Sequence, residues 1–223
     1  MKTFKKIWWR LLFASYTFIY LPWFFFLESK ITMDYPGIHI INGSIDDMIP
    51  FCEIFVIPYF LWFVYIAASC VFMLLKANNQ EFISFALSLI IGMSVCMIIC
   101  MIYPNGLTLR PESTSDTILG KMVASLYKTD TPTNVFPSIH VYNSIAVHVA
   151  LVKCTALKNH KPVKNASLIL CILICMSTVF LKQHDVAGGI ILIGVIYHLL
   201  YALPEKKAQK QPASQKSCIS VEE

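Results

Sequence analysis

Apolar residues fall in long blocks separated by short polar segments, without the alternation of amphipathic strands or helices. A helix needs about 20 apolar residues to cross a hydrocarbon core about 30 Å thick. A spanning segment must satisfy its own backbone hydrogen bonds, so the blocks predict helices. We therefore predict an all-α, polytopic membrane protein with a six-helix transmembrane bundle, whose helices lie at about residues 7–27, 51–75, 82–103, 136–157, 166–181 and 186–203.

The blocks differ in ways that refine this prediction. The first follows a basic start, but it is long and aromatic and has no small-residue cleavage site, which favours a membrane helix over a signal peptide. The last two are short, as expected for modest tilt or local thinning of the bilayer. Residues 1–203 are predicted to form one domain, and the polar residues 204–223 a disordered cytoplasmic tail.

Composition and charge exclude an ordinary soluble domain and suggest an orientation. Only 14% of residues are charged, against roughly 25% in soluble domains. With a cytoplasmic N-terminus, 13 of the 18 Lys and Arg residues fall on the inner side. We therefore predict a multi-pass protein of the plasma membrane with both termini cytoplasmic. Its lysines suit a lipid bilayer with anionic headgroups, and the net charge of +5 indicates no nucleic-acid partner.

Eight cysteines lie mostly within the apolar blocks. Two pairs are one helical turn apart, Cys96 with Cys100 and Cys171 with Cys175, but neither has a histidine or carboxylate beside it. We interpret them as small buried hydrophobic residues, with a metal site or a disulfide as the alternative. No metal or cofactor is predicted.

Three polar clusters interrupt the apolar pattern, and the predicted topology puts all of them on the outer side. They are Arg110-Pro111, the segment 136–140 at the start of the fourth helix, and the segment 182–185 between the fifth and sixth helices. Together they bring two histidines, an arginine and a lysine to one membrane depth. Ionisable groups in such positions are costly and tend to be functional.

Phosphoryl transfer is the chemistry that best matches this set, because its catalysis is mostly electrostatic. An arginine fork holds two phosphate oxygens, and the N-terminus of a helix offers free N–H groups to an anion. One neutral histidine attacks phosphorus, and a second, protonated one gives its proton to the leaving oxygen.

These clusters resemble the three motifs of the type 2 phosphatidic acid phosphatase superfamily, near its bacterial inositolphosphorylceramide-synthase-like branch. The family pattern is Lys-x6-Arg-Pro, then Pro-Ser-Gly-His, then Ser-Arg-x5-His-x3-Asp. Here Tyr103 stands in place of the first lysine and Ile139 in place of the glycine. Ser177 keeps its spacing to His184, whereas Thr178 replaces the arginine. The resemblance covers about residues 50–203.

The resemblance implies a metal-independent enzyme that acts on a membrane lipid phosphate. It makes His184 the nucleophile and His140 the general acid. Arg110, Lys182 and Ser138 would hold the phosphate, with Lys182 supplying the cation missing at Thr178.

One departure concerns the acid that orients the nucleophile. The family aspartate follows the histidine by four residues, but here that position is Gly188 and the nearby acid is Asp185. Adjacent residues of a helix point about 100° apart, so Asp185 serves only if the segment 182–186 is non-helical. The alternatives are that a backbone carbonyl orients His184, or that activity is weak or lost. A catalytically weakened lipid-binding or transport protein is therefore the rival function.

Overall fold

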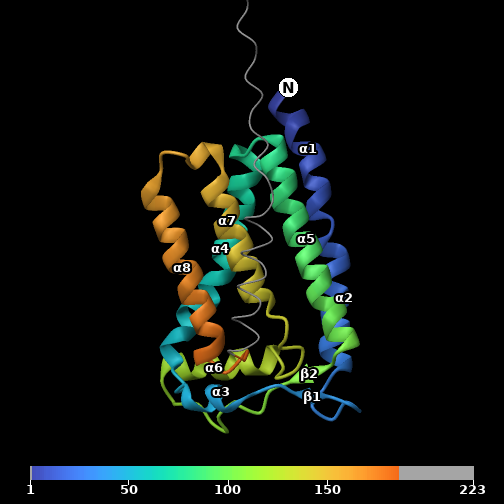
Figure 1. The fold of residues 1–223 in the computed structure, drawn as a ribbon, viewed down its shortest axis with the longest axis vertical. Coiled ribbons are helices and arrows are strands. Elements are labelled where there is room, and N and C mark those ends of the chain that lie inside the picture. Colours follow the sequence, from blue (N-terminus) through green and yellow to red (C-terminus); the bar gives the residue numbers. More distant parts are fainter. Residues whose placement is uncertain (1, 186–223) are drawn as a thin grey trace, which may run out of the picture.

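The computed structural model of the protein describes residues 2–185, and in this part the chain is mainly helical. Long helices stand side by side, and most of the short elements gather at one end, which we call the α6 end (Figure 1). The sixth predicted helix, 186–203, and the tail, 204–223, lie outside the described residues. The long elements are α1 (Lys2–Ala14), α2 (Thr17–Lys30), α4 (Val56–Lys76), α5 (Asn79–Ile102), α7 (Ile139–Lys153) and α8 (Lys161–Phe180).

Within residues 2–185, four segments are long and apolar enough to cross a membrane: Ile7–Lys30, Glu53–Lys76, Asn79–Ile102 and Lys161–Phe180. They match the first, second, third and fifth predicted spans. The described part of the chain is therefore mainly helical and has four candidate membrane-spanning segments, as expected for a membrane protein.

The helix α7 is shorter than the fourth predicted span, 136–157. It has 15 residues, because Ser138 caps its start and the backbone becomes extended at Cys154. The apolar pattern alone did not predict these two helix ends. This helix, which carries His140, packs mainly against α5 and α8, inside the bundle.

The first predicted span, 7–27, is not one continuous helix. It divides into α1 and α2 at Ser15 and Tyr16. The Ser15 hydroxyl donates to the Leu12 carbonyl at 2.6 Å, and the Tyr16 amide donates to Phe13, three residues back. Such tight local bonds replace the regular helical ladder and interrupt it.

The segment 104–135, predicted only as an outer loop, contains further structure. Thr117 caps α6 (Ile118–Thr129) by accepting the Gly120 amide at 3.0 Å. The apolar face of α6 packs through Val123 and Leu126 against the α4 side of the bundle. The other short elements are β1 (His39–Ile40), α3 (Ser44–Met48), η1 (Glu53–Phe55), β2 (Asn105–Gly106) and η2 (Thr155–Leu157), with β1 and β2 paired in parallel.

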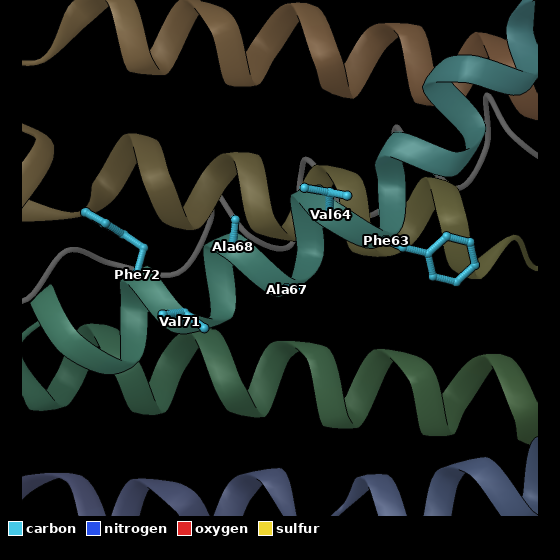
Figure 2. Close-up of a pocket in the computed structure, with 6 residues that line it drawn as sticks. All are labelled: Phe63, Val64, Ala67, Ala68, Val71 and Phe72. Atoms are coloured by element: carbon cyan, nitrogen blue, oxygen red, sulfur yellow. The ribbon is translucent and has the colours of Figure 1, made fainter.

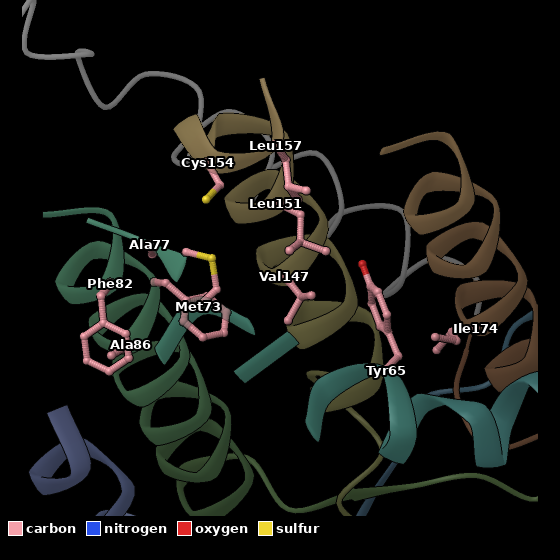
Figure 3. Close-up of a cluster of buried hydrophobic side chains, with 11 residues drawn as sticks. Tyr65, Met73, Ala77, Phe82, Ala86, Val147, Leu151, Cys154, Leu157 and Ile174 are labelled. Atoms are coloured by element: carbon pink, nitrogen blue, oxygen red, sulfur yellow. The ribbon is translucent and has the colours of Figure 1, made fainter. Parts of the chain in front are cut away.

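The largest apolar core lies towards the end of the bundle opposite α6, where α4, α5, α7 and α8 meet (Figure 3). Arg10 is buried beside this core and binds the end of α4, donating to the carbonyls of Leu74 at 2.6 Å and Ala77 at 3.0 Å. Carbonyls of the last helical turn have no intrahelical partner, so a cation there stabilises the helix. The core and the Arg10 contacts together fix the bundle on which the α6 end is built.

Candidate active site

The three polar clusters of the sequence meet at the α6 end. Arg110 follows β2, Ser138 and His140 begin α7, and the segment 182–185 follows α8. The α6 helix and the loop up to Val135 lie between them. Segments far apart in the sequence are thus brought to one end of the molecule, as the predicted topology requires.

The end of α8 determines where His184 lies. The Gln183 amide donates to the Thr178 carbonyl at 2.9 Å, and the Lys182 amide donates to the Val179 carbonyl at 3.0 Å. With Lys182 at a φ of 52°, this is a Schellman motif that has lysine where glycine is usual. The segment 181–184 is therefore non-helical. The sequence set this condition for the segment 182–186, of which residue 186 lies outside the described residues.

The two histidines lie together. The ring centroids of His140 and His184 are 5.8 Å apart and the rings are inclined by 52°. We call these two residues the histidine pair. Their arrangement agrees with the requirement that both imidazoles act on one reacting group.

The orientation of His184 comes from a backbone carbonyl. Its Nδ1 is hydrogen-bonded to the Val135 carbonyl oxygen, and the side chain is buried. A carbonyl only accepts, so Nδ1 carries the proton and the lone pair of the neutral ring is on Nε2. Burial lowers the pKa of His184, while the Val135 bond and the charges of Asp130 and Asp185 oppose this shift. Burial thus favours the neutral ring of His184, with its lone pair on Nε2.

This geometry bears on the alternatives for the missing aspartate. The structure gives Nδ1 of His184 the Val135 carbonyl as its partner, which is the second alternative. Asp185 is buried next to His184 and acts on it through its charge. In the described structure, orientation and charge stabilisation therefore come from two different groups.

His140 stands between aromatic rings at the start of α7. Its ring centroid is 4.6 Å from that of Tyr59 and 4.4 Å from that of Trp62. Ser138 caps the helix by accepting the Val141 amide at 3.3 Å. The N–H groups of the first turn have no intrahelical acceptor, so this end of α7 is suited to an anion.

Arg110 lies at this end, but its terminal nitrogens are already used. Nη1 donates to the Asp130 carbonyl at 2.7 Å, and Nη2 donates to the Thr131 carbonyl at 2.9 Å and to Oε1 of Gln183. The guanidinium also lies 4.5 Å from the centre of the Tyr127 ring. Arg110 thus ties the two residues after α6 to the turn after α8.

The charged end of Lys182 is bonded to the end of α3. Its Nζ donates to the carbonyls of Asp46 at 2.5 Å and Ile49 at 2.6 Å, at the end of α3. The sequence placed its charge one helical turn from Thr178, but the left-handed backbone at Lys182 changes the direction of the side chain. In this structure the ammonium group of Lys182 is thus bonded to two backbone carbonyls of the protein.

Sequence reasoning missed several residues around the pair. The Tyr59 hydroxyl donates to Asp130 at 2.6 Å, and Glu28 accepts from Thr131 and Asn134. Gln183, which precedes His184 in the chain, is almost fully buried and bonds to Arg110. Gln183 could have been predicted from the sequence, because it is a polar residue next to the candidate nucleophile. Glu28 could not, because its contacts are with residues about 100 positions away.

Two other features of the described residues lie apart from this site. An apolar groove runs along α4, lined by Phe63, Val64, Ala67, Ala68, Val71 and Phe72 (Figure 2). The seven cysteines described are free, and among residues 2–185 no group of three or more His, Cys, Asp and Glu residues is placed to hold a metal ion.

Comparisons of the chain with protein-family models, curated proteins and solved structures find no match.

Proposed function

We propose that the protein is an integral membrane lipid phosphatase or phosphotransferase, which works through a phosphohistidine. The substrate is a membrane lipid with a phosphate monoester or pyrophosphate headgroup. The observation that carries the proposal is the histidine pair, with 5.8 Å between ring centroids and the proton of His184 held on Nδ1. Two imidazoles this close together can supply the nucleophile and the general acid of one reaction.

In the first step, Nε2 of His184 attacks phosphorus and forms an N–P bond while the P–O bond to the leaving group breaks. His140 gives a proton to the leaving oxygen. Burial and the neighbouring His184 lower the pKa of His140 to about 3, so it holds that proton only when the negative charge of the phosphate lies beside it. In the second step, water or an acceptor hydroxyl gives its proton to His140 and attacks phosphorus, which breaks the N–P bond. The Val135 carbonyl and the charge of Asp185 stabilise the positive ring of the intermediate.

The experiment is turnover by purified protein with phosphatidic acid and a polyprenyl pyrophosphate as substrates. We expect His184→Ala to abolish phosphate release and His140→Ala to lower it about 10²- to 10⁴-fold, as for loss of a general acid. Mass spectrometry of the trapped enzyme should find phosphate on His184. His160→Ala is the matched control, because His160 is exposed at the opposite end of the bundle. Equal release by His184→Ala and the parent would contradict the proposal.

A catalytically weakened lipid-binding or transport protein is the second candidate. It is favoured by one observation: the charged ends of Arg110 and Lys182 are bonded to oxygen atoms of the protein itself. Charge available to stabilise a transition state is reduced accordingly. Saturable binding of phosphatidic acid without turnover, unaffected by His184→Ala, would favour this candidate.

A further inference from the structure

Gln183 is 2% exposed, and only half of its amide is used. Its Oε1 accepts a hydrogen bond from Nη2 of Arg110. A guanidinium has donors only, so the amide oxygen must face Arg110 and the amide nitrogen must face away from it. Within the described residues Nε2 of Gln183 is buried and has no hydrogen-bond partner.

Two more N–H donors near the histidine pair are also buried without a hydrogen-bond partner in the described structure. Nε of Arg110 and Nε1 of Trp62 are buried and make no hydrogen bond within residues 2–185. The Trp62 ring centre is 4.4 Å from that of His140, and Arg110 is bonded to Gln183. The carbonyl oxygens of Asn134 and Asn143 are also unsatisfied, and neither bonds to these donors.

Buried donors from α4, from the loop after β2 and from the turn after α8 thus lack an acceptor in the described part of the chain, one of them beside His140 and two of them at the Arg110–Gln183 contact. A buried donor without a partner loses the hydrogen bond that it makes to water in the unfolded chain, so such groups are seldom retained without a use. An oxyanion is the ligand class that offers several acceptor atoms at once. Its binding to Nε2 of Gln183 breaks no hydrogen bond of the protein.

We propose that Gln183 is an oxyanion-binding residue, whose Nε2 donates to a non-bridging phosphate oxygen of the substrate. Gln183 thereby has the phosphate-binding role that the sequence analysis gave to Lys182. Arg110 orients the amide, and its own Nε is the neighbouring donor. The inference rests on the proposed phosphoryl transfer for its substrate, a lipid phosphate, and on the orphan donors for its geometry.

The substitution Gln183→Glu tests this role. Glutamate retains an oxygen for Arg110, and it replaces the N–H donor by a negatively charged oxygen that repels phosphate. We expect KM for phosphatidic acid and the inhibition constant of inorganic phosphate to rise about 10- to 100-fold, with a smaller change in kcat. Gln80→Glu is the matched control, since Gln80 is exposed at the start of α5, at the opposite end.

Phosphate-induced thermal stabilisation in detergent separates this inference from the proposed function. Stabilisation that persists in His184→Ala and disappears in Gln183→Glu supports the role of Gln183, even when no turnover is found. An active Gln183→Glu protein with unchanged KM and unchanged phosphate inhibition overturns it, as does a parent protein that phosphate does not stabilise. If the glutamate variant does not fold, Gln183→Met gives the same comparisons without a new charge.

Discussion

At the scale of the residue, the protonation of His184 couples the site to the stability of the fold. Burial lowers the folded-state pKa of this imidazole, whereas in the unfolded chain it stays near ~6.5. Between these two values the unfolded chain binds more protons than the folded one. The free energy of unfolding therefore falls as the pH falls through the unfolded value.

We predict that the melting temperature of the parent decreases between about pH 8 and about pH 5, and that His184→Asn decreases less. Asparagine retains an N–H donor for the Val135 carbonyl but does not titrate. Differential scanning calorimetry in detergent measures both profiles, with His160→Asn as the control. Parallel profiles of parent and His184→Asn would show that His184 does not contribute to the pH dependence.

At the scale of the element, Lys182 joins the end of α8 to the end of α3. Its ammonium group binds two carbonyls of the 46–49 segment, and both lose their partner when the charge is removed. The position is already left-handed, so a substitution by another non-glycine side chain adds no new backbone strain.

We predict that Lys182→Met lowers the free energy of unfolding by about 2 kcal/mol, as for loss of hydrogen bonds to a charged donor. Inhibition by inorganic phosphate should stay unchanged, because Nζ is bonded to two carbonyls at the end of α3. Denaturation and inhibition assays with Lys128→Met, an exposed lysine of α6, as control decide this. Weaker phosphate inhibition with unchanged stability would restore Lys182 as a phosphate ligand.

The elements also show how far the sequence was informative. Blocks of apolar residues predicted α4, α5 and α8 because hydropathy over about 20 residues is a local property. The spacing of the motifs between these helices predicted that His140 and His184 lie at the same end of the bundle. The directions of Arg110 and Lys182 depended on carbonyls 17 to 136 residues away, which no local pattern contains. Val123 and Leu126 have the three-residue spacing of a helix face, but α6 was not predicted because polar residues surround it in the sequence.

At the scale of the whole molecule, large apolar side chains cover the outside of the bundle. Phe18 on α2, Val64 on α4, Ile102 on α5 and Ile169 on α8 are each at least 60% exposed. Water would make such a surface aggregate, whereas a bilayer covers it without cost. The polar site at the α6 end then lies at one membrane surface, and the basic 153–164 segment lies at the other (Figure 1).

That arrangement makes orientation testable. The excess of basic residues beside the end opposite α6 predicts that this end is cytoplasmic and that the site is on the outer face. In a cysteine-free background, we predict that Ser113→Cys, in an exposed loop at the α6 end, reacts with a membrane-impermeant maleimide in intact cells. Lys158→Cys, exposed at the opposite end, should react only after permeabilisation. The reverse pattern would put the histidine pair in the cytoplasm, and the substrate would then be a lipid phosphate of the inner leaflet.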